Sequence, residues 1–351
     1  MDYGLIGCGR IAENHIAAAQ SCGLNIVALC DIDEEKMQRL AERFKLNAHL
    51  YKSYDTMLKK EKLSLVAVAT PSGSHAVVAV ACIDAGCNVI IEKPVALSLH
   101  DADHIIEVAR WHNVVACACH QNRFNKAVQR LRGAVEQGRF GKLYYGVANV
   151  RWNRGEEYYK QAPWRGTYAQ DGGALMNQCI HNIDLLRWLM GDEVSSVCAV
   201  TANLAHPFIE VEDLGLAVVR FKNGSFGIIE GTTNIYPKNM EETLAIFGAT
   251  GTAKAGGKSL NILEEWCFAD NSDEPKLVKQ ASAEESINVY GAGHKALYAD
   301  ALNAIENNVP PYVTLEAGRR ALELVLAIYH SAATGRWVKL PLKRGDCSDF
   351  H

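Results

Sequence analysis

The stretch GLIGCGRIAENH, residues 4–15, decides the fold of the first part of the chain. It supplies Gly7, Gly9 and Ala12 in a GxGxxA arrangement, directly after an apolar run and at the start of a helix-forming segment. Gly7 permits a tight turn, Gly9 lets a pyrophosphate approach the backbone, and Ala12 allows close helix–strand packing. The stretch therefore predicts a dinucleotide site at a helix N-terminus. Further cofactor contacts predicted in this loop are Cys8, Arg10 and Ile11.

Short β-branched runs alternate with helical segments through the first 120 residues. The expected strands are YGLIG (3–7), NIVALCD (25–31), LSLVAVAT (63–70), NVIIEKP (88–94) and VVACACH (114–120). Strands that alternate with helices of about ten to fifteen residues indicate βαβ units and a parallel sheet. The first part of the chain is therefore predicted to be an α/β Rossmann domain.

The pattern changes near residue 143 to longer runs in which polar and apolar residues alternate. Such runs are typical of an antiparallel sheet with one covered face. The expected strands are 143–153, 194–204, 213–224, 225–234 and 242–256, and the expected helices are 172–191 and 315–335. We predict a dinucleotide-binding domain over residues 1–122 and an α+β domain for substrate binding and oligomerisation over residues 123–351.

Composition limits the classes of function. A net charge of −4 over 351 residues argues against a nucleic-acid partner. The sequence starts without a signal-peptide pattern and has no apolar run long enough to span a bilayer, so we expect no membrane partner and a cytoplasmic location. The eleven cysteines lie mostly in apolar runs without CxxC pairs, which predicts reduced thiols and no metal.

Polar residues that follow the predicted strands mark the cofactor crevice. Asp31 ends the second strand, where a carboxylate binds ribose hydroxyls and repels a 2′-phosphate, which favours NAD over NADP. Asp31 capping the next helix is the alternative, and Arg10 would tolerate a 2′-phosphate. Further contacts are predicted at Ile32, Thr70, Pro71, Ser72 and His75.

The segment NVIIEKP carries Glu92 and Lys93 at the end of the fourth predicted strand. Pro94 has no N–H and therefore ends the backbone hydrogen bonding of this strand. In a doubly wound sheet this position lies at the ligand crevice. We expect Lys93 near the nicotinamide, with its pKa lowered by partial burial so that it accepts or relays a proton. A solvated strand end is the alternative reading.

Six motifs in order resemble the glucose-fructose oxidoreductase, inositol dehydrogenase and MocA (Gfo/Idh/MocA) family. They are the GxGxxA loop, ATPSGSH (69–75), EKP (92–94), QNRFN (121–125), WRG (164–166) and GGALMNQCIHNIDLL (172–186). The resemblance implies a Rossmann domain followed by a domain with a large, mostly antiparallel sheet, whose open face makes oligomer contacts. The cofactor contacts it implies are Glu92, Lys93, Gln121, Asn122, Trp164 and Arg165.

The resemblance also implies that Lys93 and His181 face the substrate carbon, and either one could be the base. Asn177 precedes His181 by four residues, so one helix face presents both. Many family members have aspartate where this chain has Asn177, which shifts the proton chemistry towards His181 and Lys93. Asp184 is expected to be structural.

Several stretches, among them APWRGTYAQDGGALMNQ (162–178) and VYGAGHKALYAD (289–300), are similar to enzymes that oxidise C3 of UDP-N-acetylglucosaminuronic acid in surface-polysaccharide biosynthesis. This resemblance implies a UDP-sugar substrate, reoxidation of NADH by 2-oxoglutarate, and a homotetramer. Open alternatives are UDP-N-acetylglucosamine, a free sugar or cyclitol as substrate, and a non-catalytic NAD-binding sensor. The substrate contacts predicted besides Lys93 are Arg123, Tyr159, Asn177, His181, Tyr290 and His294.

Overall fold

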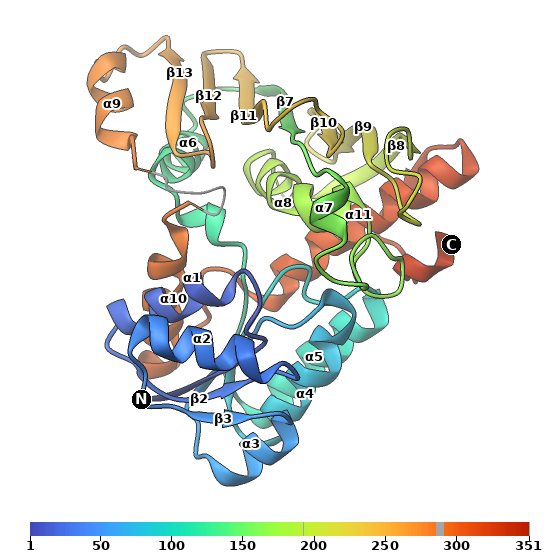
Figure 1. Ribbon diagram of the computed structural model, residues 1–351. Coiled ribbons are helices and arrows are strands. Elements are labelled where there is room, and N and C mark those ends of the chain that lie inside the picture. Colours follow the sequence, from blue (N-terminus) through green and yellow to red (C-terminus); the bar gives the residue numbers. More distant parts are fainter. Residues whose placement is uncertain (192, 286–290, 351) are drawn as a thin grey trace. The chain divides into compact units, whose positions relative to one another are not determined.

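The structure is a computed structural model that describes residues 1–191, 193–285 and 291–350. These residues form two compact units, and Figure 1 shows the elements of each. The first unit comprises Met1–His120 and His294–Arg319, and the second comprises Gln121–Gly293 and Arg320–His351. Within the described ranges, no helix combines the length and the apolar character needed to cross a bilayer.

The first unit is built on a six-stranded parallel sheet in the order β3-β2-β1-β4-β5-β6. This is the strand order of a doubly wound dinucleotide-binding fold. Its strands are β1 (Asp2–Ile6), β2 (Asn25–Cys30), β3 (His49–Tyr51), β4 (Leu65–Val68), β5 (Asn88–Ile91) and β6 (Ala116–Ala118). All four residues of β4 are buried, as expected for a parallel strand covered on both faces.

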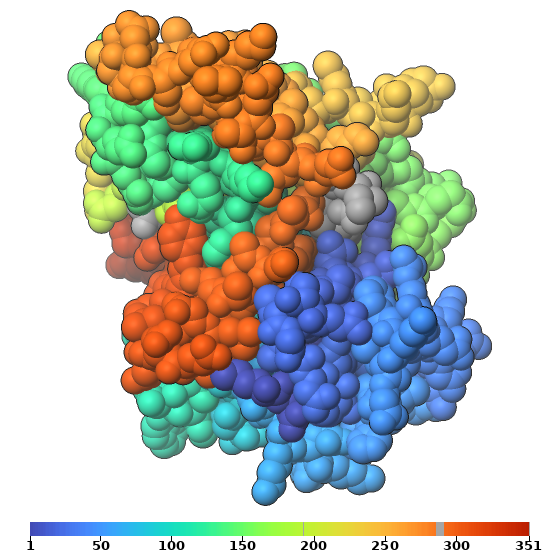
Figure 2. All heavy atoms as spheres, turned by 90° about the vertical axis from the view of Figure 1, so that its left-hand side faces the viewer, coloured from blue at the N-terminus to red at the C-terminus, as the bar shows by residue number. Residues whose placement is uncertain are grey.

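Helices cover both faces of this sheet. Figure 1 shows α1 and α2 on one face and α4 and α5 on the other. The helical elements are α1 (Ala12–Ser21), α2 (Glu34–Phe44), α3 (Tyr54–Lys60), η1 (Ser72–Ser74), α4 (His75–Asp84), α5 (Leu99–His112) and α10 (Gly293–Asn307). Figure 2 shows the orange-red α10 segment beside the dark-blue start of the chain. The Cys22 thiol donates to the Lys295 carbonyl there.

The compact units differ from the predicted domain limits of 1–122 and 123–351 in one respect, since His294–Arg319 packs with the first unit. The reason is the packing of α10 against the start of the chain. The Tyr298 hydroxyl lies 2.7 Å from the Tyr3 hydroxyl, and both side chains are fully buried. A buried hydroxyl pair of this kind ties the late helix to the first strand.

The second unit contains an eight-stranded sheet in the order β13-β12-β11-β7-β10-β9-β8-β14. Only the β7–β10 pair is parallel among these neighbours. The strands are β7 (Leu143–Arg151), β8 (Val194–Ala202), β9 (Leu214–Phe221), β10 (Phe226–Thr232), β11 (Glu241–Gly248), β12 (Gly251–Gly256), β13 (Ile262–Phe268) and β14 (Val338–Lys339). The predicted fold class, a Rossmann domain followed by a mostly antiparallel domain, is confirmed.

One face of this sheet is covered by helices, among which α8 packs against β7, β10 and β11. The helical elements are η2 (Gln121–Phe124), α6 (Lys126–Glu136), α7 (Glu156–Tyr159), η3 (Ala174–Cys179), α8 (Ile180–Leu189), α9 (Pro275–Ser282), α11 (Leu315–Thr334, which begins in the first unit) and η4 (Cys347–Phe350). Gly146 and Gly227 allow close packing, since a Cβ at either would meet the Leu186 side chain at 2.7 or 3.1 Å. The sheet therefore packs closely against α8.

Candidate functional site

The predicted cofactor loop joins β1 to α1. Gly7 has φ +99°, and a Cβ there would lie 2.3 Å from the Ala69 carbonyl oxygen, so glycine is required. A Cβ at Gly9 would meet nothing within 4 Å, and Gly9 and Arg10 are exposed. No side chain of the described residues caps α1, so no side-chain acceptor competes with a phosphate at the positive end of this helix. These features fit a dinucleotide.

Asp31 does not cap the helix that follows it, because the N-cap of α2 is Asp33. The Asp31 carboxylate instead accepts hydrogen bonds from the Cys8 N–H at 2.7 Å and the Asp33 N–H at 2.9 Å. Each carboxylate oxygen keeps a further lone pair for a ribose hydroxyl. The neighbouring Ile32 is 90% exposed. The helix-cap alternative is therefore wrong, and the arrangement fits the ribose-binding role.

His75 joins two of the predicted loops. Its Nδ1 lies 2.7 Å from the Pro94 carbonyl oxygen, and its Nε2 lies 2.8 Å from the Thr70 carbonyl oxygen. Burial lowers the pKa of His75 against the two carbonyl contacts, which act to raise it; a neutral ring donates to one of these carbonyls and a protonated ring to both. The ring holds the Thr70 loop against the Glu92–Pro94 segment, so it acts through those loops. Pro71 is half-buried, and Ser72 is buried at the start of η1.

Glu92 follows β5 directly and is 7% exposed, whereas Lys93 is half-buried. One Glu92 oxygen lies 3.1 Å from His15 Nε2, and the other accepts a hydrogen bond from the Lys93 N–H at 3.2 Å. Burial acts to raise the pKa of Glu92, but the His15 and His294 imidazoles outweigh it and hold that pKa well below its usual range. A buried carboxylate therefore fixes the backbone at Lys93.

The predicted residues of the second unit gather around the loop before η3. Arg165 donates to the Tyr158 hydroxyl at 2.5 Å, and its guanidinium stacks 4.6 Å from the Trp164 ring. Gln178 donates to the same hydroxyl at 3.0 Å and to the Asn177 side-chain oxygen. These hydrogen bonds place Trp164, Arg165 and Asn177 in one cluster.

The buried carboxylate of Asp171 connects the loop of this cluster to Asn177. Asp171 accepts hydrogen bonds from the Gly166 N–H at 2.8 Å and from the Asn177 side-chain amide. It is 2% exposed. The sequence reasoning did not select Asp171, although an acidic residue directly before Gly172-Gly173 was a usable signal. The loop and Asn177 are thus fixed by one aspartate.

His181 lies on α8 one turn after Asn177, and it is 7% exposed. The predicted single helix is α-helical only from Ile180 onward, because Ala174–Cys179 forms a π-helix. Such turns are frequent at functional sites.

Tyr159, a predicted substrate contact, lies in the same unit. Its hydroxyl lies 3.3 Å from Thr233 Oγ1, and burial raises the pKa of Tyr159 to about 12.

Arg123 and His294, two of the predicted substrate contacts, are both buried. Arg123 is 4% exposed and binds the Asp184 carboxylate through Nε and Nη2, both at 2.7 Å, so its guanidinium is engaged in the core. His294 is 4% exposed in the first unit, beside Glu92. Burial favours structural roles for both residues. Tyr290 lies outside the described residues.

Gln121 and Asn122, predicted to contact the cofactor, are each 2% exposed in η2. The Asn122 amide donates to Glu242 Oε1 at 3.4 Å. Burial raises the pKa of Glu242 to about 8, although Arg154 lowers it in part. Glu242 is a titrating group that the sequence pattern did not reveal, because alternation along a strand shows which residues are buried but not their ionisation.

Comparison with known proteins agrees with this geometry. Residues 1–120 match the oxidoreductase family described as Gfo/Idh/MocA, NAD-binding Rossmann fold, and residues 132–340 match its C-terminal alpha/beta domain. The chain belongs to the Gfo/Idh/MocA oxidoreductase family. The predictions of this family and of NAD as the cofactor are thereby confirmed.

Three similar proteins are informative about this Gfo/Idh/MocA member. The WlbA dehydrogenase of Bordetella pertussis, solved with NADH and UDP-GlcNAcA, is 37% identical with a TM-score of 0.91, covering 98% of each chain. The WlbA dehydrogenase of Chromobacterium violaceum, solved with the same ligands, is 36% identical with a TM-score of 0.88, covering 98% of this chain and 96% of that one. Myo-inositol 2-dehydrogenase of Thermotoga maritima is 27% identical, covering 97% and 98%.

Proposed function

We propose that the chain is an NAD-dependent dehydrogenase that oxidises the C3 hydroxyl of UDP-N-acetylglucosaminuronic acid to the 3-keto sugar. The observation that carries this proposal is the likeness, over 98% of the chain, to two dehydrogenases solved with NADH and UDP-GlcNAcA. Their identities of 37% and 36% exceed the 27% shared with the inositol dehydrogenase.

The proposed reaction removes a hydride from the sugar carbon and a proton from its hydroxyl. NAD, when bound, supplies the hydride acceptor. Lys93 and His181 are the two proposed proton-transfer groups, one taking the hydroxyl proton and the other donating a hydrogen bond to the same oxygen. Asn177, held by Asp171, is proposed to orient the sugar by hydrogen bonding. No carboxylate is required at position 177 for this scheme.

A multiply anionic substrate and cofactor need cations that are not already paired. Arg165 is half-buried, and it makes no ion pair with any of the described residues. Its stacking on Trp164 holds the guanidinium in place, which suits recognition of a phosphate or carboxylate. Arg165 is proposed to bind such a group.

The wider setting follows from the same likeness. We propose that 2-oxoglutarate accepts the hydride when NADH is reoxidised, and that the 3-keto sugar serves surface-polysaccharide biosynthesis in the cytoplasm. None of the eleven cysteines, all within the described residues, forms a disulfide, and this fits the proposed location.

A panel of substrates tests the proposal. Purified protein with NAD and 2-oxoglutarate is offered UDP-N-acetylglucosaminuronic acid, UDP-N-acetylglucosamine and myo-inositol, and NADH and keto product are measured. We expect kcat/KM for the uronic acid to exceed that for UDP-N-acetylglucosamine at least about 100-fold, because the site binds the carboxylate. Equal turnover of the two sugars would contradict the substrate assignment.

The second candidate function is oxidation of a free cyclitol, which the similarity to myo-inositol 2-dehydrogenase favours. Turnover of myo-inositol alone would support it. NAD binding without turnover of any panel member would favour a non-catalytic sensor instead.

A further inference from the structure

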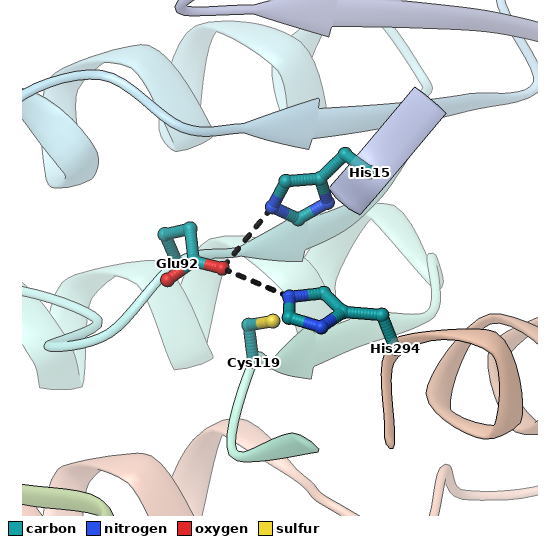
Figure 3. Close-up of side chains that lie close together, drawn as sticks. All are labelled: His15, Glu92, Cys119 and His294. Carbon is teal, nitrogen blue, oxygen red and sulfur yellow. Dashed lines mark hydrogen bonds and ion pairs between the residues drawn. The ribbon is translucent and has the colours of Figure 1, made fainter. Parts of the chain in front are cut away.

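Four side chains of the first unit converge on one buried point. They come from well-separated segments: His15 from α1, Glu92 after β5, Cys119 after β6 and His294 from α10. Each offers one potential ligand atom, and these atoms all lie within 4.8 Å of one another. Figure 3 shows the Glu92 carboxylate between the two imidazoles, with the Cys119 sulfur beside the His294 ring. We propose that these residues bind a divalent transition-metal ion of the zinc class.

The distances suit a tetrahedral ion. Metal–nitrogen, metal–oxygen and metal–sulfur bonds of about 2.0–2.3 Å place neighbouring ligand atoms about 3.3–3.8 Å apart. Glu92 Oε1 lies 3.1 Å from His15 Nε2 and 3.9 Å from His294 Nε2, so these two distances bracket the range. All ligand atoms lie within 4.8 Å of one another, so small side-chain movements would complete the site.

The chemistry of the four ligands selects the ion. Two imidazoles, a carboxylate and a thiolate suit zinc or cobalt and not magnesium or calcium, which prefer oxygen alone. A dication also balances the two negative charges of the carboxylate and thiolate, which matters in an interior that solvent does not reach. All four residues are at most 7% exposed.

The surroundings orient the proposed ligands. His15 Nδ1 lies 2.7 Å from the Tyr298 hydroxyl, which in turn lies 2.7 Å from the Tyr3 hydroxyl. A metal-binding imidazole commonly uses its second nitrogen in such a contact, which fixes the ring. This contact directs Nε2 of His15 towards Glu92.

His294 provides an independent observation. Its side chain is 5% exposed, and neither ring nitrogen has a hydrogen-bond partner among the described residues. Glu92 Oε1, 3.9 Å from Nε2, is too distant for a hydrogen bond, and a buried imidazole without a hydrogen bond is unfavourable because both of its polar atoms have lost water. Coordination of a metal through Nε2 would satisfy one of them. The ion would also fix Glu92, whose second oxygen holds the Lys93 backbone.

The test uses the full chain, freed of metal by a chelator and titrated with Co²⁺ alone. We expect one equivalent to bind and to give the visible spectrum of tetrahedral cobalt together with a thiolate-to-metal charge-transfer band. Zn²⁺ added afterwards should remove both signals. The thermal midpoint should rise with either ion, because the ions bind the folded chain. This readout does not depend on the proposed substrate.

Variants test which side chains bind the ion. Cys119→Ala should abolish the charge-transfer band, whereas Cys117→Ala, which removes another buried thiol two residues earlier, should keep it. Tyr298→Phe should weaken Co²⁺ binding about ten- to a hundredfold by removing the outer partner of His15. Retained NAD binding shows that each variant is folded.

Two outcomes would overturn the proposal. One is a folded wild-type protein that gives no tetrahedral cobalt spectrum. The other is an unchanged spectrum in Cys119→Ala and His294→Gln, which would place the bound ion at another site on the chain.

Discussion

At the scale of single residues, Lys93 is the group on which the proposed chemistry depends most. We expect Lys93→Ala to lower kcat about 10²–10⁴-fold, because a positioned proton-transfer group is lost. The affinity for NAD, measured by fluorescence titration, should stay within a few-fold of wild type. Lys59→Ala on α3 serves as a control with the same charge change. Unchanged turnover in Lys93→Ala would remove Lys93 from the mechanism.

Asp31 is expected to set the cofactor preference. Replacing it with serine removes the negative charge that disfavours a 2′-phosphate, so the ratio of kcat/KM for NAD to that for NADP should fall at least about tenfold. Asp33→Ser is the matched control, since it removes the same charge two residues away while serine still caps α2, so it should leave that ratio and the thermal stability close to wild type. Equal ratios in Asp31→Ser and wild type would contradict the assignment.

Glu242 predicts a pH-dependent stability. Burial raises its pKa from 4.5 to about 8, so between these values the folded chain keeps a proton that the unfolded chain has released. The free energy of unfolding therefore falls as the pH rises through this window and levels off above it. Glu242→Gln cannot ionise. Its stability relative to wild type should therefore be greater at pH 9 than at pH 5, by on the order of 4 kcal/mol.

Urea denaturation at pH 5, 7 and 9 measures this effect. Glu265→Gln, an exposed position on β13, should show no such change with pH. A constant difference between Glu242→Gln and wild type across the three pH values would mean that Glu242 is ionised throughout.

The sequence points to residues whose type is fixed by a local turn or strand end. It does not point to residues whose role depends on tertiary packing. Gly7 and Asp31 were selected because the turn and the strand end constrain their residue type. Asp171 and Glu242 were missed, since their partners Gly166 and Asn122 depend on tertiary packing. His294 was placed by its glycine-rich neighbourhood, and only the structure shows its burial beside Glu92.

At the scale of elements, one ionic cluster ties η2 to α8. Arg123 binds Asp184 through two nitrogens, Arg187 lies 3.1 Å from the same carboxylate, and all three are at most 4% exposed. Asp184→Asn should lower the free energy of unfolding by about 3–5 kcal/mol, because two buried guanidinium groups lose their counter-charge. Chemical denaturation at neutral pH measures the loss.

A surface ion pair provides the comparison for this prediction. Glu136→Gln removes the i,i+4 partner of Arg132 at an exposed position and should change stability far less. Equal losses in Asp184→Asn and Glu136→Gln would show that the buried cluster contributes no more than a surface pair.

The elements that the sequence missed are short or joined by tight turns. β3 has three residues, and none of them is buried, so no apolar run marked it. The predicted strand 242–256 is the hairpin of β11 and β12, which turns at Ala249-Thr250 between two glycines. The period-2 pattern continues through such a turn, so it could not show that the chain reverses.

At the scale of the whole chain, the order of elements predicted two folding units but not the return of α10 to the first. Periodicity describes each helix by itself, whereas the partner of Tyr298 on β1 lies 295 residues earlier in the sequence. Such long-range packing is not visible in local patterns.

The uncovered face of the second sheet predicts association with a second copy. Tyr145, Val218, Phe226 and Ile228 are 38–45% exposed, and they come from three adjacent strands. Val218 pairs with Ile228, and Phe226 pairs with Tyr145, so the four side chains form one continuous apolar patch. Patches of this kind mark interaction surfaces, and identical flat faces can pack about a twofold axis.

One such interface gives a dimer, and the homotetramer that the family resemblance implies needs a second contact as well. We therefore expect light scattering of the wild-type protein to give a mass near four times the 38.5 kDa of one chain. Ile228→Glu should reduce that mass, because it buries a charge in the interface. Val77→Glu, at an exposed apolar position of α4, introduces the same charge elsewhere and should leave the assembly intact. A wild-type protein that is monomeric at micromolar concentration, or an Ile228→Glu variant that keeps the full mass, would exclude this face as the interface.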